Sequence, residues 1–481
     1  MHSVSIESLW PFLGFVAAVI HLSGILSAFH AIVRTRTAQG AVAWAISLVT
    51  LPYLALPLYW IFGRGKFYGY VAARRSGDLK IHHIAADLRD RLKRPDTRFQ
   101  TPEGCSLRVL ERLAGMPFTS GNEIEVLQDG SAAYGAMFDA IDAAQRYVLL
   151  QSYLIRDDDL GRDLKARLLR TARRGIAVHL LYDEIGSYGL PANFGAELMA
   201  GGVKVRAFST VRGPVNRFQL NFRNHRKSLV VDGSKAFVGG LNYGDEYLGR
   251  SGPFGAWRDT HVRLSGPAVQ AVQLAFVEDW YWAAREVPEL LWDPRPGSGG
   301  AAALVLPTGP ADHWDSCELF LLEVIRTAKT RIWIASPYFV PDEQIVSALQ
   351  LASLRGVEVR ILLPLQADHV LMDWASYAYY PMAERAGIEI YRYEAGFLHQ
   401  KVLLVDDTLA SIGTANLDNR SFRLNFEIST VVWDRRFAGL VETMLRDDFS
   451  ASRKVVAGEL DDKSVWFRFG VRFSRLFAPI L

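Results

Sequence analysis

The sequence predicts an α/β fold built from two duplicated halves and preceded by a hairpin of two transmembrane helices. Three observations lead to this prediction. One short motif occurs twice in similar surroundings, apolar β-rich runs alternate with helical stretches around both copies, and two long segments near the N-terminus contain no charged residue. Strands that alternate with helices along a chain are typical of α/β architecture.

The repeated motif combines a histidine, a lysine, an aspartate and an asparagine. In both copies the lysine follows the histidine by two residues, the aspartate by seven and the asparagine by seventeen. The two sets are His225, Lys227, Asp232 and Asn242, then His399, Lys401, Asp406 and Asn416. Flanking segments repeat with offsets of 174 to 185 residues, a period that predicts a duplicated domain half rather than a repeat array.

Each histidine precedes a short apolar run that reads as a buried strand, at residues 228–231 and 402–405. Helices are expected at residues 160–173 and 343–354, and a longer loop at 208–224 in the first half. Side chains two apart in a strand point to the same face, so each imidazole is expected beside its lysine. One copy supplies only half of a plausible active site, and the two halves are therefore expected to share one.

Residues 9–33 and 41–63 contain no Asp, Glu, Lys or Arg. Each segment is long enough to cross a hydrocarbon core of about 30 Å. A cleaved signal peptide is disfavoured, because residues 1–8 carry no Lys or Arg and a second span follows. Pro52 and Pro57 leave open a shallow or kinked second segment.

The chain is expected to divide into five parts: a transmembrane hairpin (1–63), a linker or juxtamembrane segment (64–120), the first half (121–300), the second half (301–460) and an amphipathic C-terminal segment (461–481). Two basic residues lie between the spans and five follow the second, which places the bulk of the chain in the cytoplasm. In the C-terminal segment, Arg468, Arg472 and Arg475 recur at helical spacing among aromatic residues. Both a helix on an anionic bilayer and a helix packed on the protein fit this pattern.

The composition excludes several classes of function. Lys and Arg number 54 against 51 Asp and Glu, so a net charge of +3 gives no global polybasic surface for nucleic acid. The two cysteines show no Cys/His spacing of metal type, so neither a metal site, a cofactor nor a disulfide scaffold is expected. The oligomeric state stays open.

The paired motif, with a trailing Gly-Gly/Thr-x-Asn, resembles the phospholipase D superfamily. Four further stretches resemble its bacterial cardiolipin synthase branch, namely residues 223–227, 257–261, 337–341 and 413–427. The N-terminal pair of spans also resembles that branch. The resemblance covers nearly the whole chain, apart from residues 79–121. It implies a multi-pass protein of the bacterial inner membrane that moves a phosphatidyl group from one phosphatidylglycerol to another, through a phosphohistidine, and releases glycerol.

The residue types suit this chemistry. A neutral imidazole can attack phosphorus, while a second one protonates the leaving alkoxide and then deprotonates the incoming alcohol. Lys227, Lys401, Asn242 and Asn416 can hold the non-bridging oxygens. The resemblance favours His225 as the nucleophile and His399 as its acid–base partner. It also implies that Asp232 and Asp406, although part of the candidate catalytic motif, hold the motif loop.

Each histidine needs a partner that fixes its tautomer. The resemblance implies an acidic residue of the same or the opposite half, and Asp259 and Glu427 stand at corresponding places, 34 and 28 residues after their histidines. Four arginines in or near the longer first-half loop are expected to capture anionic lipid head groups: Arg212, Arg217, Arg223 and Arg226.

The same motifs also occur with functions other than phosphatidyl transfer between two phosphatidylglycerol molecules. Water as the acceptor would make the protein a phospholipase D, and phosphatidylethanolamine as the donor would give another route to cardiolipin. A nuclease is disfavoured by the spans and the near-neutral charge. A non-catalytic membrane scaffold is disfavoured by the intact motifs. The choice of acceptor depends on water exclusion and pocket shape, which the sequence does not reveal.

Overall fold

The computed structural model describes residues 6–63, 66–67, 70, 79–99, 107–210, 221–250 and 254–481. The chain forms two compact units. The first comprises Met1–Val71 and Thr210–Phe222, and the second comprises Ala72–Ser209 and Arg223–Leu481.

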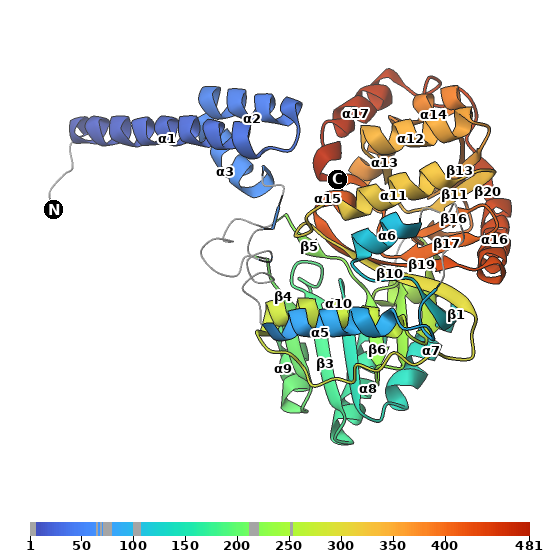
Figure 1. Ribbon diagram of the computed structural model, residues 1–481. Helices are drawn as coiled ribbons and strands as arrows, with labels where there is room; N and C mark the ends of the chain where they lie inside the picture. Colours follow the sequence, from blue (N-terminus) through green and yellow to red (C-terminus); the bar gives the residue numbers. More distant parts are fainter. Residues whose placement is uncertain are drawn as a thin grey trace. The chain divides into compact units, whose positions relative to one another are not determined.

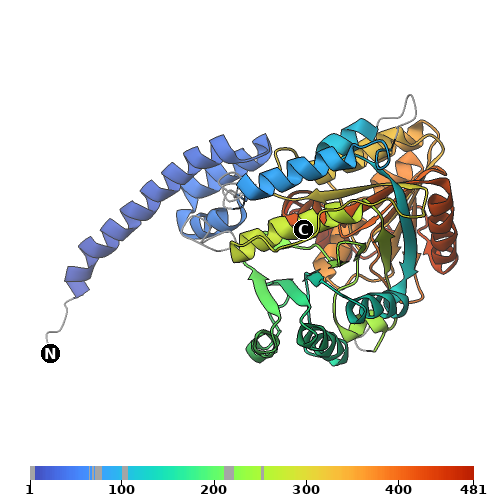
Figure 2. The same ribbon diagram turned by 60° about the horizontal axis from the view of Figure 1, so that its bottom comes forward.

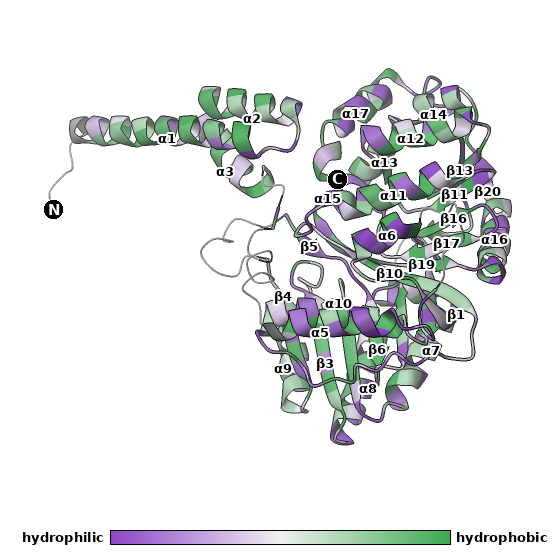
Figure 3. Cartoon of the chain, viewed as in Figure 1, coloured by the Kyte–Doolittle hydropathy of each residue, from purple (hydrophilic) through white to green (hydrophobic). Residues whose placement is uncertain are grey.

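The first unit contains three apolar helices: α1 (Ile6–Arg34), α2 (Ala38–Thr50) and α3 (Pro52–Phe62). Figure 3 shows hydrophobic residues along all three. They pack around Ala31, Leu48 and Tyr59. By length and composition, Trp10–Arg34 within α1 could cross a membrane. The first predicted span is therefore present as one continuous helix.

The second predicted span is not one continuous helix, so the expected two-helix hairpin is supported only in part, and the kinked alternative that Pro52 and Pro57 leave open is the one present. α2 has 13 residues and α3 has 11, so they measure roughly 20 and 17 Å and neither crosses a core of about 30 Å alone. Between them Leu51 leaves helical geometry, with φ −131° and ψ 54°. The break has a local cause, because Pro52 lacks an N–H and restricts the backbone of the residue before it.

Both halves of the second unit contribute to one sheet, which has 16 strands within the described residues: fifteen follow one another, and β5 (Arg223–Asn224) pairs with β19 (Asn425–Trp433) beside this path (Figure 1). The first half supplies, in order, β4 (Lys204–Phe208), β3 (Ala177–Asp183), β2 (Tyr147–Ser152), β6 (Ser228–Val231), β7 (Lys235–Gly239), β9 (Thr260–Ser265) and β1 (Thr119–Gln128). The second half continues with β10 (Ala301–Thr308), β19 (Asn425–Trp433), β17 (Leu409–Gly413), β16 (Val402–Val405), β11 (Arg331–Ala335), β13 (Glu358–Pro364), β14 (Glu389–Tyr393) and β20 (Ser452–Lys454).

The two halves share one connectivity. β2, β3 and β4 run parallel, as do β11, β13 and β14. The strand after each histidine, β6 or β16, then pairs antiparallel with β2 or β11 and with its own hairpin partner. Every residue of β6 and β16 is buried, which confirms the prediction of a buried strand after each motif. Each histidine therefore lies just before the N-terminal end of an equivalent interior strand of the sheet.

Helices cover both faces of each half (Figures 1 and 2). In the first half these are α7 (Asp129–Asp142), α8 (Asp159–Arg173), α9 (Ala192–Ala200) and α10 (Val269–Ala284). In the second half they are α11 (Ser316–Thr327), α12 (Glu343–Leu354), α13 (Val370–Tyr377), α14 (Tyr380–Ala386) and α16 (Arg435–Ser450). The helices expected at residues 160–173 and 343–354 are α8 and α12. Each begins after an aspartate that caps it: Asp158 accepts a hydrogen bond from Gly161 N and Asp342 from Ile345 N, both at 3.0 Å.

Part of the expected linker is helical. α5 (Leu79–Leu92) packs Leu88 and Leu92 against Leu274 of α10, in the first half. α6 (Leu107–Ala114) places Leu107 and Leu110 in the core of the second half. α5 thus packs on the first half and α6 on the second, and both described helices belong to the second unit.

We predict that deleting residues 1–63 weakens membrane recovery but leaves the α/β unit folded. The reason is that the two large hydrophobic cores of the described residues lie between Leu107 and Ala478. Sedimentation with membranes and circular dichroism of the truncated protein test this. An unfolded circular dichroism spectrum in detergent-free buffer would contradict it.

Candidate active site

His225 lies where the two halves exchange strands. β5 (Arg223–Asn224) ends directly before it and pairs in parallel with the start of β19. The His225 N–H donates to the Phe426 carbonyl at 2.9 Å, which sets the histidine beside Glu427. The imidazole Nδ1 lies 3.0 and 2.9 Å from the two Glu427 carboxylate oxygens. The histidine of the first half therefore takes its acidic partner from the second half.

His399 repeats this arrangement in the other direction. β15 (Phe397–Leu398) ends directly before it and pairs in parallel with β8 (Trp257–Arg258) of the first half. The His399 N–H donates to the Arg258 carbonyl at 2.8 Å. Nδ1 of His399 lies 2.7 Å from Asp259 Oδ2. Of the two alternatives that the sequence leaves open, the structure has the acidic partner in the opposite half.

The two carboxylates have different surroundings. Glu427 accepts hydrogen bonds from the Thr414 hydroxyl at 2.6 Å, the Ser421 hydroxyl at 2.9 Å and the Asn425 amide at 3.1 Å. Burial alone would raise the Glu427 pKa, but His225, Lys227 and Thr414 stabilise the charge and hold this pKa below its usual value.

Asp259 has fewer donors around it. The Thr260 N–H donates to its Oδ1 at 2.7 Å, and burial raises the Asp259 pKa despite nearby Lys401. Gly240 occupies the place that Thr414 has in the other half. A Cβ at Gly240 would lie 2.1 Å from Asp259 Oδ1, so no side-chain hydroxyl fits there.

Both motif lysines are buried beside their histidines. Lys227 Nζ donates to the His225 carbonyl at 2.8 Å. Lys401 Nζ donates to the His399 carbonyl and lies 3.0 Å from His399 Nδ1. Burial lowers both lysine pKa values, that of Lys401 to about 8. A bound phosphate anion would favour the charged form of either lysine.

Burial favours the neutral form of both imidazoles. Burial lowers the pKa of His225 to about 4 even though Glu427 acts in the opposite direction. Burial and the two lysines hold the pKa of His399 well below its usual value. A neutral imidazole is the form that attacks phosphorus. Because Nδ1 of each ring faces an acidic oxygen, Nε2 is left to meet the substrate.

The two asparagines are partly engaged by the protein. Asn242 Oδ1 accepts from Leu154 N at 3.1 Å, and its amide donates to the Tyr247 hydroxyl at 2.5 Å. The Asn416 side chain hydrogen-bonds Asp418. Each amide nitrogen has two hydrogens, so one donor per asparagine remains available to a phosphate oxygen.

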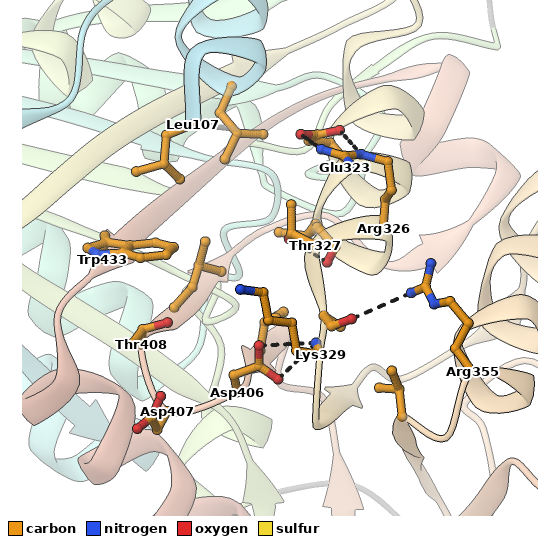
Figure 4. Close-up of a pocket in the computed structure, with 16 residues that line it drawn as sticks. Leu107, Glu323, Arg326, Thr327, Lys329, Arg355, Asp406, Asp407, Thr408 and Trp433 are labelled. Atoms are coloured by element: carbon orange, nitrogen blue, oxygen red, sulfur yellow. Dashed lines mark hydrogen bonds and ion pairs between the residues drawn. The ribbon is translucent and has the colours of Figure 1, made fainter. Parts of the chain in front are cut away.

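Asp232 and Asp406 lie at the other end of β6 and β16 from the histidines. Asp232 accepts the backbone N–H groups of residues 145–147 at 2.9, 2.7 and 2.9 Å. Asp406 likewise accepts those of residues 329–331, one of which Figure 4 shows. Both aspartates have positive φ, 54° and 52°. We therefore assign them a structural role in the loops, as the family resemblance implies.

The head-group arginines divide into three groups. Arg212 and Arg217 lie outside the described residues. Arg226 is a correction: it is buried against Asp279 at 2.9 Å and donates to the Glu427 carbonyl at 3.0 Å, so it braces the core. Arg223 hydrogen-bonds Tyr153, whose ring lies 5.0 Å from that of His225. Among the two described members of this set, Arg223 is the one linked to the His225 ring, through Tyr153.

Sequence reasoning missed several residues around the histidines. Arg420 interacts with both Arg223 and Tyr153, and burial and Arg223 lower its pKa. Trp257 and Tyr247 lie against the His399 ring, with centroids 5.2 and 5.7 Å away. The signal for Arg420 is its place four residues after Asn416, inside the segment that matches the family.

A cavity of about 720 Å³ lies away from the histidines (Figure 4). Its lining includes Lys329, Asp406, Thr408 and Trp433, at the turn between β16 and β17. Because Lys401 and Asp406 flank opposite ends of β16, this cavity is separate from the candidate active site. The described residues contain no group of three His, Cys, Asp or Glu placed to hold a metal ion.

We predict that kcat/KM falls as the pH rises above about 8, because the free protein then loses the Lys401 proton that attracts the phosphodiester. A pH profile from 5 to 10 measures this, and Lys401→Arg should move the alkaline limb upward. A profile that stays flat to pH 10 would contradict the assignment.

We predict that Asp406→Ala lowers the free energy of unfolding by about 2–4 kcal/mol, because three backbone donors lose a charged acceptor. Asp406→Asn should cost less, since asparagine tolerates positive φ. Denaturant unfolding at neutral pH measures both. The structural role would be wrong if Asp406→Ala kept full stability while activity was abolished.

Comparisons with known proteins identify the family of the chain. The family model described as "Cardiolipin synthase, PLD-like domain" matches residues 137–277 and 321–449, and the phospholipase D-nuclease N-terminal model matches residues 23–64. Cardiolipin synthase A of Pseudomonas entomophila is 48% identical over 98% of both chains. Cardiolipin synthase A of Pseudomonas fluorescens is 47% identical over 97% of this chain and 98% of that protein.

The fold has a relative among solved structures. The crystal structure of phosphatidylserine synthase from Haemophilus influenzae superposes with a TM-score of 0.60 at 13% identity, and covers 78% of this chain and 99% of that chain. The family model matches more than half of the chain, and the curated relatives match nearly all of it. The chain belongs to the phospholipase D-like cardiolipin synthase family.

Proposed function

We propose that this protein makes cardiolipin by moving a phosphatidyl group from one phosphatidylglycerol to another and releasing glycerol. One observation carries the proposal. Two buried imidazoles, each paired with an acid of the opposite half, lie close enough for His225 to lower the pKa of His399, in a chain nearly half identical to proteins named Cardiolipin synthase A. The protein is accordingly a phosphatidyltransferase that acts on phospholipid.

The first step forms the covalent intermediate. We assign the attack to His225, whose Nε2 bonds to phosphorus while the phosphorus–oxygen bond to glycerol breaks. In the substrate complex the anionic phosphodiester and Asp259 favour the protonated form of His399, whose Nε2–H donates the proton that glycerol takes as it leaves, so that His399 is neutral after this step. Phosphorylation makes the His225 ring cationic, and ionised Glu427 stabilises that charge through Nδ1.

The second step regenerates the enzyme. The glycerol hydroxyl of a second phosphatidylglycerol loses its proton to His399, and its oxygen bonds to phosphorus as the bond to His225 Nε2 breaks. Lys227 and Lys401 offset the charge on the non-bridging oxygens in both steps. Burial of both histidines favours a lipid hydroxyl over water as the acceptor.

The membrane places substrate and enzyme together. We propose that α1 anchors the chain in the bacterial inner membrane, and that the apolar stretch after it forms a second, kinked segment. The five basic residues that follow residue 63, against two between the segments, favour a cytoplasmic catalytic unit.

The full-length protein in phosphatidylglycerol vesicles is expected to form cardiolipin and glycerol in equal amounts. Glu427→Gln should lower the rate by roughly 10²-fold or more, because the His225 ring loses its anionic partner. Arg435→Gln, on the exposed side of α16, is the control. Phosphatidic acid as the main product would make the protein a hydrolase, and no lipid product would contradict both.

The two histidines are expected to behave differently with a nitrophenyl phosphodiester lipid, whose leaving alcohol needs no protonation. His399→Ala should accumulate a phosphatidyl adduct on His225, and His225→Ala should form none. Mass spectrometry of both variants measures this. Label on His399 in the His225→Ala protein would reverse the assignment.

We further assign Arg223 and Arg420 to the binding of an anionic lipid head group, because both stand at Tyr153 beside His225. Arg420→Gln is expected to lower cardiolipin formation at least tenfold. Transfer to glycerol as a small neutral acceptor separates two roles. An unchanged rate there means that the arginines hold the acceptor lipid, and an equal loss means that they hold the donor. Full cardiolipin formation by the variant would contradict the assignment.

A further inference from the structure

The C-terminal helix α17 (Val465–Arg475) has three different faces. One face is packed on the protein. Gly470, Val471 and Ser474 are buried, and the Phe467 ring lies 5.6 Å from that of Trp374 on α13. A Cβ at Gly470 would lie 2.5 Å from the Trp374 ring, so the two helices approach as closely as a glycine allows. This face fixes the orientation of α17 on the second unit.

A second face is apolar and exposed. Trp466 is 82% exposed, Phe469 63%, Phe473 50% and Leu476 74%. These residues recur at intervals of three and four, so they form one stripe along the helix. Large apolar side chains in a contiguous exposed stripe mark an interaction surface.

The third face is cationic. Arg468, Arg472 and Arg475 are spaced four and three residues apart and lie between the buried face and the apolar stripe. Figure 3 shows hydrophilic and hydrophobic residues distributed around this helix. Arginine stems can lie along an apolar layer while their guanidinium groups reach phosphates.

We propose that the exposed face of α17 is a membrane-contact surface, with the apolar stripe in the headgroup boundary of an anionic bilayer and the arginines on its phosphates. A bilayer is favoured over a protein partner because the chain already carries an apolar helix long enough to span one, and its family acts on membrane lipid. The pattern of apolar stripe, flanking arginines and terminal tryptophan is that of an interfacial helix.

The position of α17 links this surface to the active site. The chain continues through η3 (Ala478–Ile480), and the Ile480 and Leu481 carbonyls accept from Arg420 Nη1 at 2.9 Å and Arg420 N at 2.8 Å. Arg420 lies in α15 (Asn419–Arg423), between Asn416 and Glu427. Contact of α17 with the bilayer therefore holds the segment that carries these site residues close to the lipid surface.

The test places the photoreactive residue p-benzoylphenylalanine at Phe469 in the full-length protein, reconstituted in vesicles of phosphatidylglycerol and phosphatidylcholine. Illumination is expected to give lipid adducts, identified by intact-protein mass spectrometry. The matched control carries the probe at Leu440, which is 51% exposed on α16, and should give none. Cardiolipin formation by both labelled proteins checks that they are folded, independently of where α17 lies.

Charge removal supplies a second measurement. Arg468→Gln with Arg472→Gln should lower the adduct yield at Phe469 by about fivefold per arginine, and Arg435→Gln should leave it unchanged. Cross-links to a second copy of the chain, or no adduct at Phe469, would overturn the proposal. An adduct yield independent of both arginines and of phosphatidylglycerol content would overturn its electrostatic part.

Discussion

The site depends on two reciprocal hydrogen bonds between a histidine of one half and an acid of the other. His225 pairs with Glu427 and His399 with Asp259. Neither half holds a complete site, because each contributes a histidine that only the other half orients. Replacement of either acid would leave the buried imidazole free to adopt either tautomer. The protonation state of Nε2, the nitrogen that meets the substrate, would then no longer be fixed.

Strand exchange makes these bonds possible. β5 extends from the first half onto β19 of the second, and β15 extends from the second half onto β8 of the first. In both cases the histidine N–H donates to the carbonyl directly before the partner acid. The shared register explains why the duplicated chain forms one site, since separation of the halves would break both pairings together; the sheet itself is continuous because β1 of the first half pairs with β10 of the second.

The duplication is not symmetric in its electrostatics. Thr414 donates to Glu427, whereas the equivalent Gly240 leaves room only for Asp259 itself. The pKa of Glu427 lies below its usual value and that of Asp259 above it. The His225 side is therefore better suited to stabilise a lasting positive charge on its imidazole, which is what a phosphohistidine requires.

The sequence predicts much of this arrangement because the motifs repeat residue by residue. The buried strands after both histidines and the helices α8 and α12 follow from local periodicity and capping. Which half supplies each acid is a matter of strand exchange, which no local pattern encodes. The buried role of Arg226 and the break before Pro52 depend on packing and on one backbone N–H. A basic residue in a predicted loop is expected to be exposed, and only the structure reveals a buried acidic partner such as Asp279.

The central claim is that two halves make one site, and the stoichiometry of the intermediate tests it most directly. Rapid quenching of the unmodified full-length protein with a nitrophenyl phosphodiester lipid, followed by intact-protein mass spectrometry, counts the phosphatidyl groups on each chain. The account predicts a burst of nitrophenol that approaches one per chain and one phosphatidyl group on a single histidine. Two groups per chain, one on each histidine, would show two independent sites and would contradict it.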